Sequence, residues 1–397
     1  MDTGQTFTDE QKNAVTHSVG PLLIIAGAGT GKTRVITGRI ADLVLERKVA
    51  PTSIVALTFT EKATNEMSER VDVLLPMGAD QPVISTFHGF CDRLLRERGL
   101  DIGLPTDYRL FSDTDQWFFL KKNLFKMPLD YYRPLGSPLK FITALLSHFS
   151  RLKDEDISPE DYRNYAADFG KKAITEEDKE KTTKLLELSA CYQMYQNIMI
   201  SEGALDYGDL IFYTLRLLEK RPSVLAEYRK KFLHILVDEF QDVNFAQSKL
   251  VYLLGEKADS LVVVGDDDQS IYKWRGASVA NILSFESHFS NVDRVVLSKN
   301  FRSTQSILDM SYAVIQYNNP DRLEAKEGID KRLISQINAV KKEDKPSVHM
   351  FDSDTAEVSW IANKLEELRK SGITDTAILI RTNELISKYA EDLKNRG

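Results

Sequence analysis

Residues 22–33 read Leu22-Leu23-Ile24-Ile25-Ala26-Gly27-Ala28-Gly29-Thr30-Gly31-Lys32-Thr33, a short apolar run that leads into a glycine-rich turn. The run predicts a buried strand, and the alternating glycines let the backbone turn tightly and aim its N–H groups at a polyphosphate. In such a loop Lys32 reaches the outer phosphates and the Thr33 hydroxyl ligates Mg²⁺. Ala26 replaces the glycine of the strict pattern, but the spacing is kept. The stretch predicts a nucleoside triphosphate site; the alternative is a glycine-rich loop without a ligand.

The composition is that of a globular protein with ordinary cores. With 397 residues, 42% of them hydrophobic, the chain is long enough for two or three domains. It has no long uncharged apolar run and no signal-peptide layout at its start, so we expect a cytoplasmic protein without membrane contact. A net charge of −7 gives no overall attraction to nucleic acid, so any such binding requires a local groove. Cys91 and Cys191 predict buried reduced thiols rather than a disulfide or a zinc site.

Further apolar runs end in polar or acidic loops: residues 54–57, 83–85, 233–237 and 261–264. With helical segments between them, such runs are typical of an open parallel α/β sheet whose ligand lies at the carboxyl ends of the strands.

The stretch from residue 105 to about 204 breaks this rhythm. It is poor in strand patterns and rich in helical spacing, which predicts a helical insertion in the sheet domain. The charge run at residues 175–181 predicts a solvated helix start rather than a binding site. Strands predicted at 347–351 and 377–380 indicate part of a second α/β domain.

The apolar run that ends at Val237 is followed by the acidic pair Asp238-Glu239. Directly after a buried strand, Asp238 would hold the water shell of Mg²⁺ and Glu239 would polarise an attacking water. This order of residues favours hydrolysis over phosphoryl transfer to a second substrate. The alternative is a pair of carboxylates that cap a helix.

Seven segments, in order along the chain, resemble successive motifs of the UvrD/Rep/PcrA-type superfamily 1 DNA helicases: Gln11 and residues 26–33, 58–63, 85–88, 238–242, 264–277 and 297–303. The segment at 264–277, Val-Gly-Asp-Asp-Asp-Gln-Ser-Ile-Tyr-Lys-Trp-Arg-Gly-Ala, is the most specific. The resemblance implies an α/β P-loop NTPase in three parts. These are a first RecA-like domain at 1–104 and 205–296, a helical insertion at 105–204, and an incomplete second RecA-like domain at 297–397.

The resemblance also implies a role for individual residues at the ATP site. Gln11 would read the adenine edge, for which an amide offers both a donor and an acceptor. Arg34 and Phe301 would sandwich the adenine, although the family often has tyrosine at the second position. Gln269 would sense the γ-phosphate, and Arg302 would neutralise its charge in the transition state. The implied catalytic residues are Lys32, Glu239, Gln269 and Arg302, with ATP and Mg²⁺ as cofactors.

On the DNA side the resemblance points to aromatic residues beside cations. The implied contacts are Thr58, Phe59, Thr86, His88, Tyr272, Lys273, Trp274 and Arg275. Aromatic side chains stack on bases of any sequence, while the cations lie near the backbone. For each single aromatic a place in the core is at least as strong an alternative. Trp274 is the exception, because Lys273 and Arg275 flank it.

The implied function is ATP-driven movement along single-stranded DNA, 3′ to 5′, with unwinding of duplex. Single/double-strand junctions would be substrates, and repair or replication proteins would be partners. Two alternatives stay open: a nucleotide- and DNA-binding module without efficient turnover, and the motor part of a helicase-nuclease subunit. The choice between DNA and RNA also stays open. Because the chain stops at Gly397, before the last family motifs and their second arginine, we expect slow ATP hydrolysis and no unwinding by this chain.

Replacing Trp274 with alanine tests the stacking platform. We expect Trp274→Ala to weaken binding of single-stranded DNA by about 1–3 kcal/mol, with little dependence on base sequence. Fluorescence titrations with oligonucleotides of different sequence measure this. If the variant instead unfolds at markedly lower denaturant, Trp274 is a core residue.

Overall fold

The computed structural model describes residues 6–270, 279–337 and 346–394. Residues 1–339 form one compact unit and residues 340–397 form a second, and each is described by itself. The predicted domain boundary at residue 297 stays a prediction.

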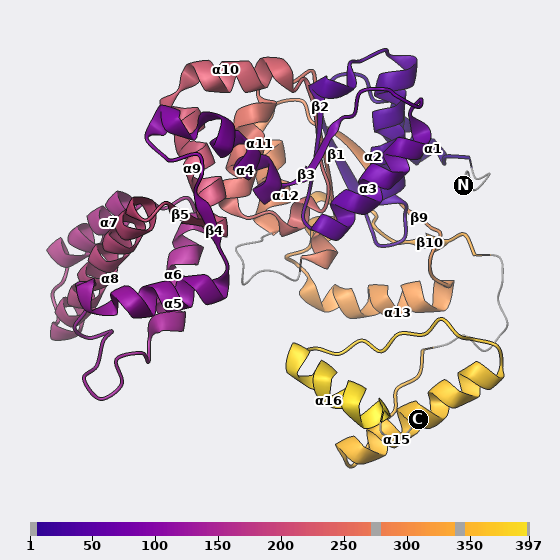
Figure 1. The fold of residues 1–397 in the computed structure, drawn as a ribbon. Coiled ribbons are helices and arrows are strands. Elements are labelled where there is room, and N and C mark those ends of the chain that lie inside the picture. Colours follow the sequence, from indigo (N-terminus) through magenta and orange to yellow (C-terminus); the bar gives the residue numbers. More distant parts are fainter. Residues whose placement is uncertain (1–5, 271–278, 338–345, 395–397) are drawn as a thin grey trace. The chain divides into compact units, whose positions relative to one another are not determined.

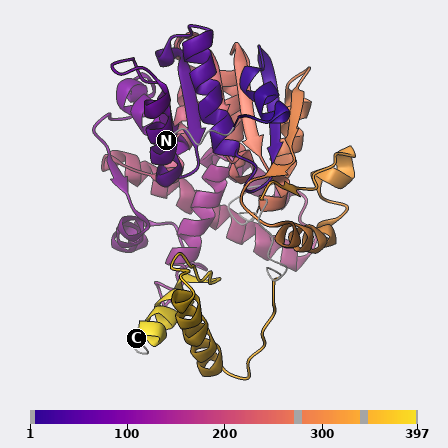
Figure 2. The same ribbon diagram turned by 90° about the vertical axis from the view of Figure 1, so that its right-hand side faces the viewer.

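A parallel sheet forms the centre of the first unit (Figures 1 and 2). Its strand order is β3-β2-β6-β7-β1-β8, and neighbouring strands run parallel. The strands are β1 (Gly20–Ala26), β2 (Ile54–Thr58), β3 (Val83–Thr86), β6 (His234–Val237), β7 (Ser260–Gly265) and β8 (Asp293–Leu297). The structure confirms the predicted α/β fold and adds β8, which the sequence analysis did not predict.

Helices cover both faces of this sheet and create two cores (Figure 1). Because successive strand residues point to opposite faces, Leu23 and Ile25 face one core while Leu22 and Ile24 face the other. The first core is covered by α4 (Phe87–Arg98), α9 (Tyr207–Lys220), α10 (Pro222–Lys231), α11 (Phe245–Gly255) and α12 (Val279–His288). The second is covered by α1 (Asp9–Thr16), α2 (Lys32–Ala41) and α3 (Glu61–Leu74). We call the sheet with these helices the sheet domain.

The chain leaves the sheet domain for the helical insertion through β4 (Arg109–Phe111) and returns through β5 (Ala204–Asp206). These two short strands pair with each other. Between them lie α5 (Asp113–Asn123), α6 (Ile142–Asp154), α7 (Pro159–Lys171) and α8 (Glu176–Ser201), packed around a separate core (Figure 1). Thr175 caps α8 at its exposed charge run, which confirms the predicted helix start. Cys91 and Cys191 are both buried and free, as predicted.

After β8 the first unit continues through β9 (Lys299–Asn300), α13 (Gln305–Ile315), α14 (Leu323–Glu327) and β10 (Ile334–Ser335), with β10 paired to β9. The second unit contains α15 (Asp354–Lys370) and α16 (Asn383–Lys394), joined by an ion pair between Lys388 and Asp354 at 2.6 Å. The strands predicted at 347–351 and 377–380 are wrong, since both segments are irregular and expose Val348 and Leu379. An apolar run forms a strand only where a neighbour completes its hydrogen bonds, and none does so among the described residues. No helix in the described ranges is long and apolar enough to cross a membrane.

A buried ion network fastens the helical insertion to the sheet domain. The Lys153 ammonium on α6 lies 2.6 Å from a carboxylate oxygen of Asp206 and 2.7 Å from one of Asp209. Burial opposes the charge on Lys153, but the two carboxylates outweigh it, so its pKa lies well above the ordinary value. The network therefore needs all three charges together.

We expect Lys153→Met to lower the free energy of unfolding of the first unit by about 3–5 kcal/mol, because it leaves two buried carboxylates without a cation. Urea unfolding measures the change. The matched control is Lys171→Met, which breaks an exposed pair with Asp168 and should leave the midpoint unchanged. Equal midpoints for the two variants would contradict a structural role for the network.

Candidate nucleotide-binding site and adjoining groove

The glycine-rich loop joins β1 to α2, which begins at Lys32. Gly29 and Gly31 have positive φ angles of 79° and 88°. A Cβ atom on Gly29 would lie 2.6 Å from the Cβ of Arg302, and one on Gly31 would lie 2.9 Å from Nε2 of Gln11. The backbone conformation therefore requires glycine at both positions, and at Gly29 the space requires it as well.

A cavity of about 360 Å³ lies at this loop and brings together residues from distant segments. It is lined by Gln11, Ala28, Gly29, Gly31, Lys32, Thr33, Arg34, Glu66, Arg70, Glu239, Gln269, Phe301 and Arg302. The remaining predicted residues are buried and do not line it: Ala26, Gly27, Thr30 and Asp238.

Glu66 and Arg70 were not predicted. They form an ion pair one helical turn apart on α3. Their opposite charges at i and i+4, on the helix that follows the motif at 58–63, are the signal that could have found them.

Lys32 and Glu239 contact one another in the cavity. The Lys32 ammonium lies 2.5 Å from Oε2 of Glu239, and the Gln241 amide donates to the same oxygen at 2.7 Å. Glu239 has a φ of 49°, a left-handed conformation that costs a non-glycine residue about 1–3 kcal/mol and is concentrated at functional sites. A polyphosphate that attracts Lys32 would release the Glu239 carboxylate to act on a water.

The acidic segment has the chemistry of a divalent-cation site. Burial, and then the charge of Glu239, raises the pKa of Asp238 to about 6. The same two causes raise the pKa of Asp242 to about 6. A nearby cation would favour the ionised carboxylates, and Mg²⁺ takes oxygen ligands of the kind that Asp238 and Thr33 offer. The residues present therefore fit Mg²⁺.

At the predicted adenine end, Gln11 already has two partners. Its Oε1 accepts from the backbone N–H of Thr8 at 3.1 Å, and its Nε2 donates to the carbonyl of Thr30 at 2.8 Å. Gln11 thus caps α1 and supports the loop. Arg34 and Phe301 both line the cavity, and the backbone N–H of Phe301 donates to the loop at the Gly29 carbonyl. Their contacts with adenine stay predictions.

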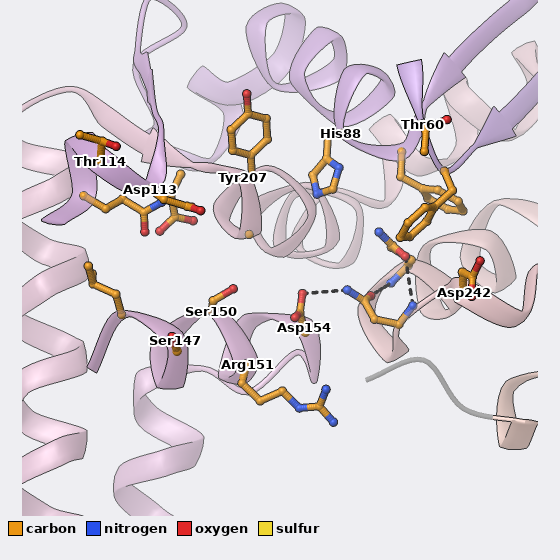
Figure 3. Close-up of a pocket in the computed structure, with 18 of the residues that line it drawn as sticks. Thr60, His88, Asp113, Thr114, Ser147, Ser150, Arg151, Asp154, Tyr207 and Asp242 are labelled. Atoms are coloured by element: carbon orange, nitrogen blue, oxygen red, sulfur yellow. Dashed lines mark hydrogen bonds between the residues drawn. The ribbon is translucent and has the colours of Figure 1, made fainter. Parts of the chain in front are cut away.

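A larger groove of about 980 Å³ lies between the sheet domain and helices α5 and α6 (Figure 3). Thr58, Phe59 and His88 line it, whereas Thr86 does not. The Thr86 hydroxyl instead caps α4 and donates to a carboxylate oxygen of Glu61 at 3.0 Å. The other predicted DNA contacts lie outside the described residues: Tyr272, Lys273, Trp274 and Arg275.

Side chains of α6 form the opposite wall of the groove. Figure 3 shows Ser150 and Asp154 across the groove from His88 and Tyr207. The Asp154 carboxylate accepts from the side-chain amide of Asn244 at 2.7 Å, and Asn244 caps α11 directly after the acidic segment. Sequence reasoning missed this wall because the two residues lie 90 positions apart and meet only through packing.

Comparison with known proteins gives a consistent result. The UvrD/REP helicase N-terminal domain matches residues 7–290, and the UvrD-like helicase C-terminal domain matches residues 295–397. The ATP-dependent DNA helicase PcrA of Bacillus subtilis (strain 168) is 39% identical over 98% of this chain and 49% of its own length. PcrA of Leuconostoc citreum is 36% identical over 98% and 48%, and PcrA of Staphylococcus aureus (strain COL) is 38% identical over 94% and 47%. The chain spans about half the length of these relatives. Since the two family matches together account for nearly all of its residues, the chain belongs to the UvrD/REP helicase family.

Proposed function

We propose that this chain carries the ATP site and part of the DNA track of an ATP-dependent DNA helicase that moves 3′ to 5′ on single-stranded DNA. The observation that carries the proposal is the cavity in which Lys32, Glu239, Gln269 and Arg302 meet from four separate segments. The family membership and the function of the relatives, ATP-dependent DNA helicase, support the same conclusion.

Several residues that line the cavity, together with the buried Asp238, have a task in this proposal. The backbone N–H groups of the loop and the Lys32 ammonium bind the phosphates. Thr33 and Asp238 would hold Mg²⁺, which would supply positive charge at the phosphates. Glu239 orients and polarises the attacking water, while Gln269 and Arg302 act on the transferred phosphoryl group.

The groove is the proposed track for single-stranded DNA. Phe59, His88 and Tyr207 supply ring surfaces on which bases can stack. Arg151 adds a cation on the wall formed by α6. From the family resemblance, the proposal also includes strand junctions as substrates, repair or replication proteins as partners, and a cytoplasmic location. It further includes the three-part domain division predicted from the sequence.

Lys32→Ala tests the nucleotide site. Removal of the cation should weaken binding of Mg-ATP at least tenfold, because the polyphosphate loses the fixed positive charge of the glycine-rich loop. Calorimetric titration measures it, and Lys12→Ala, on the exposed side of α1, is the control. Equal affinity of the wild-type and Lys32→Ala proteins would show that the cavity is not the ATP site.

Phe59→Ala tests the groove. We expect it to weaken binding of single-stranded oligonucleotides by about 1–3 kcal/mol whatever their base sequence. Phe125→Ala removes a phenylalanine that is 79% exposed and lies outside the groove, and should leave affinity unchanged. Fluorescence anisotropy provides the measurement. Equal effects of the two variants on affinity would show that this groove is not the DNA track.

A further inference from the structure

Two cations from a downstream segment pair with the aspartates that follow β7. The Lys331 ammonium lies 2.8 Å from Oδ1 of Asp266 and 2.8 Å from Oδ2 of Asp268, and also contacts Asp267. Arg322 donates to both carboxylate oxygens of Asp268 at 2.7 Å. Three negative charges therefore share two positive charges at the end of one strand.

The ammonium of Lys331 occupies the position that a metal ion would take between these aspartates. Ligand atoms of Asp266, Asp267 and Asp268 lie within 4.8 Å of one another, close enough for a shared cation. The Lys331 side chain is only 4% exposed. Burial opposes its charge, but the three carboxylates outweigh burial and raise its pKa. Lys331 is thus a permanent counter-ion of the cluster.

Asp266 connects this counter-ion to the ATP site. Its second carboxylate oxygen, Oδ2, accepts from the side-chain amide of Gln269 at 2.7 Å, and Gln269 lines the nucleotide cavity. The backbone N–H of Asp266 donates to Oε1 of Gln241 at 3.0 Å, and Gln241 in turn donates to Glu239. One oxygen of Asp266 therefore holds Lys331 while the other holds the residue proposed to sense the γ-phosphate.

The segment that carries Lys331 is also fixed against the glycine-rich loop. The side chain of Leu333 packs so closely on Gly27 that a Cβ there would lie 2.9 Å away. Next to it, β10 pairs with β9, and Asn300 of β9 donates to the Ala28 carbonyl at 2.6 Å. The segment that carries Lys331 therefore contacts both the glycine-rich loop and the aspartates after β7.

We propose that Lys331 is a positioning residue for ATP hydrolysis, which acts through Asp266 on Gln269. This inference rests on the proposed function of the cavity. Without the ammonium, three neighbouring carboxylates repel one another and Asp266 no longer presents Oδ2 to Gln269. A misplaced group that acts on the transition state lowers the rate of the chemical step more than it lowers the affinity for substrate.

The test compares Lys331→Met with Lys331→Arg, which keeps a cation, and with the matched control Lys326→Met. Lys326 lies on α14 of the same segment, where it pairs with the exposed Asp321 at 3.6 Å. Single-turnover hydrolysis of Mg-ATP is followed with the chain in excess, with and without single-stranded DNA. We expect Lys331→Met to slow the chemical step about 10- to 100-fold while the dissociation constant for ATP changes by less than about twofold. Lys331→Arg should recover part of the rate, and Lys326→Met should keep all of it.

A rate unchanged in Lys331→Met, or a loss of ATP affinity as large as the loss of rate, would overturn the inference. A double-mutant cycle gives a second readout that general loss of structure would not produce. If Lys331 acts through Gln269, then Lys331→Met should cause no further slowing in the Gln269→Ala background. Slowing by the full factor in that background would also overturn the inference.

Binding of ADP with magnesium and aluminium fluoride, a mimic of the transferring phosphoryl group, provides the same comparison without turnover. We expect Lys331→Met to weaken this complex about 10- to 100-fold relative to ADP alone. An unchanged ratio would contradict the role of Lys331. The proposed function fails separately, when Lys32→Ala keeps wild-type nucleotide affinity.

Discussion

Parallel pairing places the carboxyl ends of neighbouring strands at one edge of the sheet, and the candidate ATP site depends on this constraint. In the observed register Ile25 of β1 lies beside Gly265 of β7, and Ala26 lies beside Leu297 of β8. Val237 of β6 lies beside Val263 of β7. The glycine-rich loop, the acidic segment after β6, the aspartates after β7 and the segment after β8 therefore all open onto the same edge.

Several acidic groups at this edge pair with nearby basic groups. Lys32 pairs with Glu239, and Lys331 pairs with the aspartates after β7, although the chain as a whole carries a net charge of −7. Under the proposed function, Lys32 would bind the phosphates of the nucleotide and Asp238 would hold its metal ion. Because Gln241 links Glu239 to Asp266, the loss of the pair between Lys32 and Glu239 would be transmitted to the second cluster through hydrogen bonds.

The groove is connected to the same edge through Asn244. This residue begins α11 immediately after the acidic segment and donates to Asp154 on the helical insertion. The insertion is in turn held by the buried Lys153 network. The acidic segment is therefore connected to the wall of the groove through Asn244 and its hydrogen bond to Asp154.

Features that depend on adjacent residues could be predicted from the sequence. The loop at 26–33 and the pair Asp238-Glu239 were recognisable because their chemistry needs a short, fixed spacing after an apolar run. The edge strand β8 was missed because its first residues, Asp293 and Arg294, are exposed and break the apolar pattern. The segments 347–351 and 377–380 have a strand-like pattern but no partner strand among the described residues.

By itself, the sequence determined the nucleotide loop, the acidic segment, the parallel α/β class and the helicase family. Each of these can be recognised from short segments of contiguous residues. Only the tertiary structure decided which distant charges meet. Lys331 lies 65 residues from Asp266 and carries no local motif, and Asp154 lies 90 residues from Asn244. Contacts of this kind require that the sheet aligns its strand ends and that the helices pack on its faces. Their stability comes from charges and hydrogen bonds that are buried together. The spacing of residues along the chain does not reveal such contacts.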